Sequence, residues 1–174
     1  TYNRNEVLKE CLQSLEKLKN TVKIKITILI IDNTINNQSF NLIKKIKKNF
    51  KYDIIQINES KRGVVNARNK ALSKLKQLKP YYVSFIDDDC KVNKLWLINI
   101  LKIIKKNHAD IVTGPQIYLE RERKINYTKF FEKKYKSKIK RVRWAATNNV
   151  FFLYSIFERE KLTFDKFLNN FGMG

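Results

Sequence analysis

The chain has 174 residues, of which 43% are hydrophobic, so it can form one domain with a substantial core and is not an intrinsically disordered chain. Lys and Arg number 37 against 16 Asp and Glu, which gives a formal net charge of +21. Two origins of that excess stay open: an anionic partner such as nucleic acid, an acidic membrane or a phosphorylated ligand, or a coding background rich in Lys, Asn and Ile.

The cysteines and the hydropathy of the chain indicate its cellular setting. Cys11 and Cys90 are the only cysteines, and their spacing matches no metal or redox motif, so a reduced, cytoplasmic setting is expected. No apolar run approaches the roughly 20 residues of a membrane-spanning helix. The sequence starts at Thr1 rather than at Met and stops on Gly174, and we expect both ends to be cut from a longer protein.

In chain order, the apolar spacing predicts four amphipathic helices, near residues 7–18, 40–50, 64–78 and 96–104. Ser39 and Asn93 are expected to cap the second and the fourth of them. Between the helices lie continuous apolar runs, typical of strands covered on both faces, at residues 26–31, 53–57, 82–86 and 110–112. Because strands and helices alternate, the sequence predicts an α/β fold with right-handed crossovers and a parallel sheet.

The pattern changes after Pro115. Residues 119–143 are dense in charge with scattered aromatic residues, which is more typical of a solvated flap than of a dedicated binding site. A further strand is predicted at 147–153, followed by a short helix at about 155–161.

Three consecutive carboxylates, Asp87, Asp88 and Asp89, follow the predicted strand 82–86 in a chain that is otherwise strongly basic. Adjacent like charges make each other harder to ionise, so a positive group or full solvation has to compensate. Asp87 and Asp89 offer hard oxygen ligands, which suit Mg²⁺ or Mn²⁺ shared with substrate phosphates. A solvated loop, or a cap for the next helix, is the alternative interpretation.

Polar clusters also follow the other predicted strands. Asp32 comes directly after residues 26–31, the loop 58–63 follows the next strand, and residues 1–4 precede the first helix. Since ligands bind outside the carboxyl ends of parallel strands, we expect these clusters to converge on the carboxylates. Asp32 is suited to accept a hydrogen bond from a nucleobase or a ribose, although it is also suited to form a turn.

Two residues near the third helix complete the predicted site. Gly63 lets the backbone approach a ligand closely. Arg68 lies one turn into the helix, where it can reach a phosphate or a carboxylate, although an ordinary surface charge is equally compatible with the pattern.

Together these motifs resemble those of the family-two glycosyltransferases, which have the GT-A fold. The resemblance covers nearly the whole chain and rests on motifs that occur in the same order: Thr1-Tyr2-Asn3-Arg4 with Leu8, Leu12 and Ser14-Leu15; Ile30-Ile31-Asp32-Asn33; Arg62-Gly63 with Ala67-Arg68-Asn69; Phe85-Ile86-Asp87-Asp88-Asp89 with Trp96-Leu97; Thr147-Asn148-Asn149; and Phe164-Asp165 with Phe171-Gly172. An Asp-X-Asp motif alone is a weak signal, whereas the ordered set is specific.

The resemblance implies a three-layer αβα sandwich with a mostly parallel, Rossmann-like central sheet. It also implies an enzyme that moves a sugar from a nucleotide-diphosphate donor, with a UDP-sugar favoured, to a glycan or lipid-linked acceptor in the synthesis of cell-surface polysaccharides or glycoconjugates. Such a transfer would proceed with inversion and would depend on Mn²⁺ or Mg²⁺.

The same resemblance assigns roles to residues. The donor-binding residues would be Thr1, Tyr2, Arg4, Asp32, Gly63, Arg68 and Asp88, and the metal ligands would be Asp87 and Asp89. A general base would take the acceptor's proton, and the family places it in a Glu-Asp pair, expected here just after Gly174. The catalytic residue is therefore not assigned within the chain. A second departure from the family pattern is Asn148, where the family often has Gly.

One glycosyltransferase-like domain is expected over residues 1–174, with a nucleotide-binding half at 1–114 and an acceptor-side half at 115–174 that is incomplete at its C-terminus. The expected partners are the donor and the acceptor, with peripheral contact to an anionic membrane as a hypothesis from charge. The expected location is the cytoplasm, including the inner face of the membrane. Two alternatives stay open, a metal-dependent nucleotidyltransferase and a basic nucleic-acid-binding protein, although no motif for specific nucleic-acid recognition is present.

Overall fold

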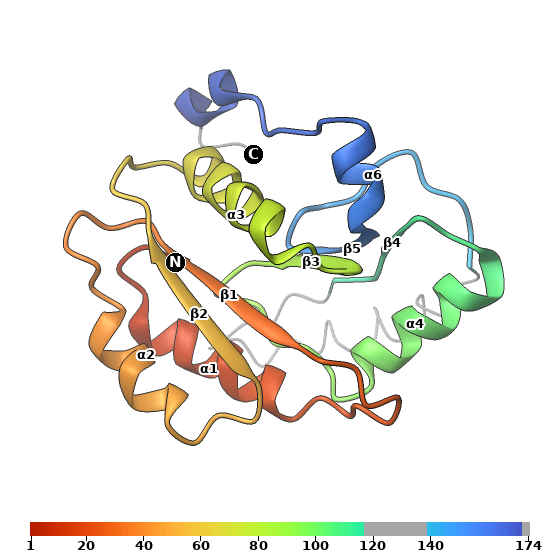
Figure 1. Ribbon diagram of the computed structural model, residues 1–174, viewed down its shortest axis with the longest axis horizontal. Coiled ribbons are helices and arrows are strands. Elements are labelled where there is room, and N and C mark those ends of the chain that lie inside the picture. The colour runs from red at the N-terminus through yellow and green to blue at the C-terminus, as the bar shows by residue number, and fades with distance from the viewer. Residues whose placement is uncertain (117–138, 172–174) are drawn as a thin grey trace, which may run out of the picture.

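The computed structural model describes residues 1–116 and 139–171 (Figure 1). Its strands are β1 (Thr27–Asp32), β2 (Asp53–Asn58), β3 (Tyr82–Ile86), β4 (Ile111–Thr113) and β5 (Asn149–Leu153). Its helices are α1 (Asn5–Glu16), α2 (Phe40–Lys47), α3 (Val64–Leu78), α4 (Trp96–Asn107) and α6 (Tyr154–Arg159), and a 3₁₀-helix, η1, covers Lys166–Phe171. The predicted helices and strands all occur, with bounds that differ by a few residues, whereas the predicted flap 119–143 lies mostly outside the described residues.

The two predicted helix caps differ in outcome. Ser39 directly precedes α2, but its hydroxyl makes no capping bond and instead donates to Asp32 Oδ2 at 2.6 Å. Ser39 is therefore the N-cap residue of α2, as predicted, but its side chain does not cap the helix, because a buried carboxylate is the stronger acceptor. The cap prediction was wrong for Asn93, because the N-cap residue of α4 is Leu95. The Asn93 side chain instead accepts from the Leu95 N–H at 2.9 Å, in the turn that leads into α4.

The strands form two hydrogen-bonded sheets. β1 and β2 pair in parallel, with Thr27 opposite Asp53 and Asp32 opposite Asn58. The second sheet has the order β3-β5-β4, and β5 runs antiparallel to both of its neighbours. The parallel sheet of the prediction is confirmed for β1 and β2. The sequence did not predict the antiparallel strand, because β5 lies outside the alternating strand–helix pattern that implied parallel pairing.

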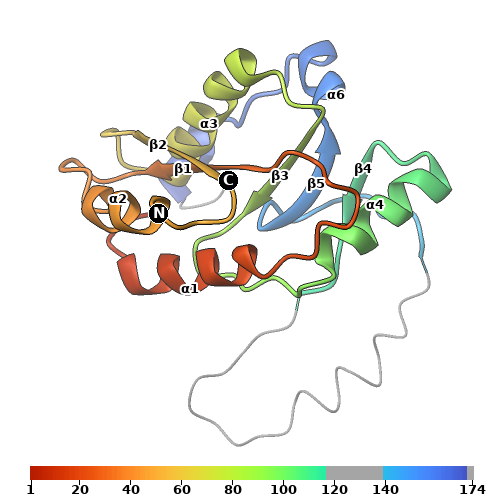
Figure 2. The same ribbon diagram turned by 60° about the horizontal axis from the view of Figure 1, so that its bottom comes forward.

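Helices cover both faces of the sheets. In Figure 2, α3 and α6 lie on one side of the strands and α1 and α4 lie on the other. Successive residues of β5 show why two covers are needed, because Val150 and Phe152 pack with α3 and α6 while Phe151 packs with α1 and α4. This arrangement is the three-layer αβα sandwich that the sequence predicted.

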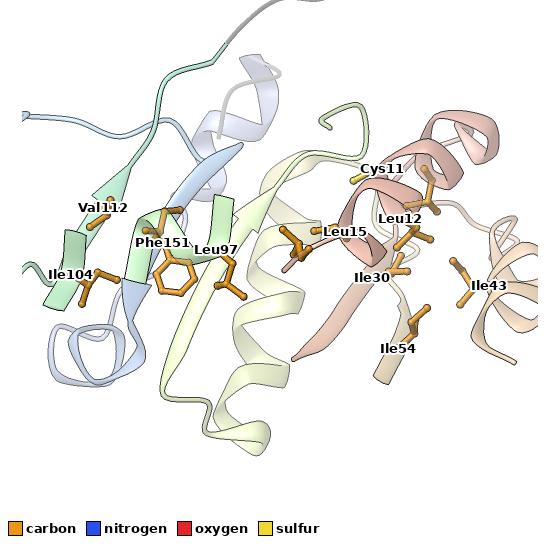
Figure 3. Packing of buried hydrophobic residues seen from close by; sticks show 13 residues of the cluster. Cys11, Leu12, Leu15, Ile30, Ile43, Ile54, Leu97, Ile104, Val112 and Phe151 are labelled. Carbon is orange, nitrogen blue, oxygen red and sulfur yellow. The ribbon is translucent and has the colours of Figure 1, made fainter. Parts of the chain in front are cut away.

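The larger core lies under α1, α2 and α4 (Figure 3). Leu12 and Leu15 of α1 meet Ile30 of β1 and Ile54 of β2, and the cluster continues to Phe151 of β5. The spacing of three and four residues along α1 turns its apolar side chains onto one face, and burial of that face stabilises the helix. This packing fixes the carboxyl ends of the strands, and the polar clusters that the sequence places after the strands begin at these ends.

We predict that Leu12→Ala lowers the free energy of unfolding by about 2–5 kcal/mol, because the side chain is only 1% exposed and its removal leaves a cavity. Urea denaturation followed by circular dichroism measures the change. Val22→Ala is the matched control: that side chain is 59% exposed, and we expect a change within about 0.5 kcal/mol. Equal losses in the two variants would contradict the placement of α1 on the sheet.

Candidate functional site

The polar clusters predicted at one sheet edge do lie together, and Asn33 joins three of them. Its backbone N–H donates to the Thr1 carbonyl at 2.8 Å, and the Thr1 nitrogen donates to the Ile31 carbonyl at 2.7 Å. The Asn33 side chain donates to the carbonyls of Glu59 and Lys61, both at 2.7 Å, and accepts from the Gly63 N–H at 2.8 Å. The segment at Thr1 and the loops after β1 and β2 are thus one hydrogen-bonded unit.

Asp32 is the buried centre of the loop after β1. The residue is 0% exposed, and its carboxylate accepts four hydrogen bonds, from the N–H and hydroxyl groups of Thr34 and of Ser39, at 2.6–3.0 Å. Burial alone would raise the pKa of Asp32, but these hydrogen bonds lower it below its ordinary value. The donor contact predicted for Asp32 stays a prediction, and a ligand would have to compete with these four bonds.

Two arginines provide the positive charge that the three carboxylates require. Arg4 Nη1 lies 3.3 Å from Asp88 Oδ1 and 3.2 Å from Asp89 Oδ2, so one nitrogen bridges two side chains. Arg68 Nη2 lies 3.5 Å from Asp87 Oδ1. The cluster of Arg4, Arg68 and Asp87–Asp89 is called the carboxylate cluster below. Its members come from the N-terminus of α1, from α3 and from the loop after β3, so the structure unites residues that are distant in sequence.

Asp87 combines burial with the repulsion of two neighbouring carboxylates. Burial raises the pKa of Asp87 above its ordinary value, and the charges of Asp89 and Asp88 add to that rise, while the nearby Arg68 lowers it. Because the raising effects prevail, further positive charge at this point would be stabilising.

Unpaired buried atoms in the carboxylate cluster and at Thr1 indicate where a ligand would bind. Among the described residues, Arg68 Nη1, Asp88 Oδ2 and Thr1 Oγ1 are buried and have no hydrogen-bond partner. A buried donor or acceptor without a partner costs about 1–3 kcal/mol, which a bound ligand would relieve. Arg68 Nη1 can donate to an anionic or carbonyl oxygen. Asp88 Oδ2 can accept from a hydroxyl or an N–H, or can bind a cation.

The carboxylates fit a metal ion that is shared with a ligand, and they do not form a complete protein cage. Within residues 1–116 and 139–171, no group of three or more His, Cys, Asp or Glu side chains is arranged to hold a metal. Mg²⁺ is commonly held by one or two carboxylates together with substrate phosphates and water, so Asp87 and Asp89 supply enough protein oxygens for such a site. The unpaired Asp88 Oδ2 adds a third oxygen beside them.

Both cysteines donate hydrogen bonds to the turn that carries the three aspartates. Cys11 Sγ donates to the Asp87 carbonyl at 3.8 Å, and the Cys90 N–H donates to the same carbonyl at 3.1 Å. Both thiols are free, and burial raises the pKa of Cys11 to about 12. Cys11 is therefore a packing residue of α1 that also helps to position Asp87.

Two of the predicted donor-binding residues, Tyr2 and Gly63, lie beside Arg62, which the sequence placed only in a motif, and Asn169, which it did not single out. The Arg62 guanidinium lies 5.0 Å from the centre of the half-exposed Tyr2 ring. Gly63 has φ +132°, and a Cβ there would overlap the side chain of Asn169. Asn169 Oδ1 accepts from the Val65 N–H at 3.3 Å, and its Nδ2 donates to the Arg62 carbonyl at 3.2 Å. The segment containing η1 thus packs on the first turn of α3.

Phe164 makes a second contact between this segment and α3. Its ring centre lies 5.5 Å from the Arg68 guanidinium, and its backbone exchanges two hydrogen bonds of 2.9 Å with the Asn69 side chain. The Asp165 carboxylate accepts a hydrogen bond from the Phe167 N–H, and Asp165 lines a groove of about 570 Å³ between α3 and residues 162–166. Asn148, the departure from the family pattern, pairs with the Gln116 side chain.

Solved structures with the same fold identify the class of protein. The crystal structure of Staphylococcus aureus TarS residues 1–349 superposes with a TM-score of 0.69 at 20% identity, covering 97% of this chain and 49% of that one. The mannosyltransferase PcManGT of Pyrobaculum calidifontis, solved with GDP-Man and Mn²⁺, gives 0.66 at 16% identity, covering 92% and 44%. The fold is therefore that of the GT-A glycosyltransferases, which confirms the predicted fold class.

Sequence comparison identifies the family. The model of the family described as "Glycosyl transferase family 2" matches residues 1–163, so the chain belongs to glycosyl transferase family 2. The poly(ribitol-phosphate) beta-N-acetylglucosaminyltransferase TarS of S. aureus strain Mu50 is 27% identical over 112 residues, which are 64% of this chain and 19% of TarS. The succinoglycan biosynthesis protein ExoM of Rhizobium meliloti strain 1021 is 26% identical over 115 residues, 66% of this chain and 36% of ExoM. The chain thus spans a minor part of each relative.

Membership of this family is a confirmed prediction and favours a sugar-transferring enzyme over a nucleotidyltransferase or a nucleic-acid-binding protein. None of the helices in the described parts of the chain combines the length and the apolar character needed to cross a membrane.

We predict that Asp32→Asn lowers the free energy of unfolding at pH 7 by about 2 kcal/mol or more, because an amide cannot accept all four hydrogen bonds. The folded-state pKa of Asp32 is lowered, so its carboxylate stabilises the fold above the unfolded-state value of about 4, and this contribution is lost as the pH falls further. Urea denaturation at pH 7 and pH 3 should show the difference between wild type and variant shrinking in acid.

The control for this experiment is Asp53→Asn, which removes an exposed carboxylate that pairs with Lys25 at 3.7 Å. Asp53 is the first residue of β2, at the opposite end of that strand from the loop that follows it. We expect it to change stability by about 0.5 kcal/mol or less at both pH values. A difference between wild type and Asp32→Asn that stays constant from pH 7 to pH 3 would contradict the role given to the ionised Asp32.

We predict that Gly63→Ala lowers stability by about 1–3 kcal/mol, because a side chain is strained at φ +132° and also overlaps Asn169. Thermal and urea unfolding measure the loss. Adding Asn169→Ala removes the overlap but not the backbone strain, so the double variant should lose less than the sum of the two single variants. Strictly additive losses would show that Asn169 does not crowd Gly63.

Proposed function

We propose that this chain is the donor-binding part of a glycosyltransferase that moves a sugar from a nucleoside-diphosphate donor, UDP-sugar favoured, to a glycan or lipid-linked acceptor. The proposed transfer inverts the anomeric configuration, requires Mn²⁺ or Mg²⁺, and serves the synthesis of a cell-surface polysaccharide or glycoconjugate. The chain covers 19% of TarS and 36% of ExoM, so the activity of a whole protein is proposed from a part.

The observation that carries the proposal is the carboxylate cluster at the carboxyl end of β3, in a chain of glycosyl transferase family 2. Three carboxylates with an unpaired oxygen, beside an arginine with an unpaired nitrogen, provide sites for a cation, a hydroxyl and a phosphate oxygen within one cluster. A sugar attached to a nucleoside diphosphate presents all of these groups when it binds with a cation. Support for UDP comes from the TarS structures, which were solved with UDP and with UDP-GlcNAc.

Residues at the start of the chain and of α3 would bind the nucleotide. The half-exposed ring of Tyr2 and the hydroxyl of Thr1 would contact the base and the ribose, and the backbone at Gly63 would allow a close approach. Arg68 would donate its unpaired Nη1 to the donor, since its other terminal nitrogen already pairs with Asp87. Asp88 would accept a hydroxyl of the ribose or of the sugar.

Asp87 and Asp89 would hold the divalent cation, which, when bound, offsets charge on the leaving diphosphate. In the proposed transfer, an acceptor hydroxyl attacks the anomeric carbon while the bond from that carbon to the diphosphate oxygen breaks, so the nucleoside diphosphate leaves with the bonding electrons. Arg68 would stabilise the charge that develops on the leaving group, because it is fixed and largely removed from water before the reaction begins. The acceptor's proton goes to a general base that we do not assign to a residue of this chain.

The acceptor side is proposed for residues 115–174 and the donor side for residues 1–114. The names of the two relatives, one acting on poly(ribitol-phosphate) and one in succinoglycan biosynthesis, support a polymeric glycan acceptor. The net charge of +21 suits an acceptor that carries phosphate or a lipid-linked diphosphate. Exposed Trp144 beside Lys140, Arg141 and Arg143 also supports peripheral contact with anionic lipid at the inner membrane face, in the cytoplasm.

We predict that UDP binds this chain in the presence of Mn²⁺, and that binding weakens at least about tenfold without the metal or in the variant Asp87→Asn/Asp89→Asn, since both changes remove the cation–diphosphate contact. Isothermal titration calorimetry measures the affinities. Asp53→Asn is the matched control, because it removes an exposed carboxylate outside the carboxylate cluster. The proposal is wrong if UDP, GDP and dTDP all fail to bind with Mn²⁺ present while circular dichroism shows a folded chain.

A further inference from the structure

The two arginines of the carboxylate cluster are held in different ways. The side chain of Arg68 is 11% exposed, projects from the interior of α3 and has the Phe164 ring 5.5 Å from its guanidinium. The side chain of Arg4 is 53% exposed, and its ion pairs within residues 1–116 and 139–171 are those with Asp88 and Asp89, both longer than 3 Å. Arg68 is therefore a fixed counter-ion, whereas little holds Arg4 in place apart from the carboxylates themselves.

The position of Arg4 at the start of α1 further weakens its interaction with the carboxylates. Arg4 is the N-cap residue of α1, and its carbonyl accepts the first hydrogen bond of the helix, from the Leu8 N–H at 2.9 Å. The N-terminus of a helix carries partial positive charge, so a cation is disfavoured there. The attraction of Asp88 and Asp89 has to overcome this repulsion, and an exposed ion pair contributes little by itself.

Arg4 also stands where a metal ion would supply its charge. Its Nη1 bridges Asp88 Oδ1 and Asp89 Oδ2, while Asp88 Oδ2 has no partner among the described residues. A divalent cation held by Asp87 and Asp89 would bring about two positive charges to the Asp89 carboxylate, and Arg4 would then be repelled by it. The guanidinium and the cation therefore compete for Asp89.

We infer that Arg4 is a displaceable counter-ion that holds the carboxylates together in the empty protein and keeps out a free divalent cation. This inference rests on the proposed function, because the partner that releases Arg4 is a nucleoside diphosphate bound with its cation. The diphosphate offers Arg4 a second set of anionic oxygens, so Arg4 moves from the carboxylates to the diphosphate as the donor binds. The cation then enters together with the donor rather than ahead of it.

The experiment measures Mn²⁺ binding without nucleotide, from the electron paramagnetic resonance signal of free Mn²⁺, for wild type and Arg4→Gln. We expect Arg4→Gln to bind Mn²⁺ about tenfold more tightly, because one positive charge next to the ligands is gone. Arg4→Lys keeps the charge and should bind Mn²⁺ as weakly as wild type. Lys25→Gln removes an exposed cation that pairs with Asp53 instead, and should also match wild type.

A second titration adds UDP. Wild type is expected to bind Mn²⁺ much more tightly in the presence of UDP, whereas Arg4→Gln should gain severalfold less from UDP, because the diphosphate has lost a partner. Equal Mn²⁺ affinity of wild type and Arg4→Gln without nucleotide, including no binding by either, overturns the inference. Failure of UDP to bind wild type with Mn²⁺ overturns the proposed function instead, and the metal-only comparison still decides whether Arg4 and a cation compete.

Discussion

Three ionised carboxylates in a row at the end of β3 repel one another, and much of the surrounding structure serves to hold them in place. Arg68 reaches Asp87 from α3, Arg4 reaches Asp88 and Asp89 from the start of α1, and Cys11 and Cys90 both donate to the carbonyl of Asp87. The arginines thus stabilise the carboxylates of this turn, and the hydrogen bonds of the two cysteines hold its backbone. Repulsion of this kind is typical of a site that binds a cation or accepts a hydrogen bond from a ligand.

Helix α3 links this turn to the rest of the molecule. Its buried face, with Leu72 and Leu75, packs on the second core, and Arg68 projects from the same rigid helix toward Asp87. Gly63, the last residue of the loop after β2, is its N-cap residue, and Asn169 of the segment with η1 binds its first turn. Arg68 and the contact with Asn169 thus belong to one packed helix, so the two sides of the proposed site share one support.

The sequence predicted what depends on local repetition and could not predict what depends on single long-range contacts. The spacing of Leu8, Leu12 and Leu15 is visible in the chain, and so is the apolar run before Asp87. Asn33, Asn58 and Asn169 have no such signal, since each binds backbone groups whose proximity exists only after folding. Ser39 shows the same limit, because its place before α2 suggested a cap while its hydroxyl binds a carboxylate seven residues earlier. The antiparallel course of β5 was missed for a related reason, as strand direction is set by the partner strands.

The position of β5 has a consequence for how this protein is made. Residues 149–153 lie between β3 and β4, although the ribosome synthesises β3 more than sixty residues earlier (Figure 1). The β3 strand therefore waits for a partner while the intervening chain is still emerging, and its apolar edge is open to unwanted pairing during that time. The donor side and the acceptor side differ in their proposed chemistry, yet they share the second sheet, so division of this chain near residue 114 would leave β3 and β4 without β5, while the β1-β2 pair would stay whole.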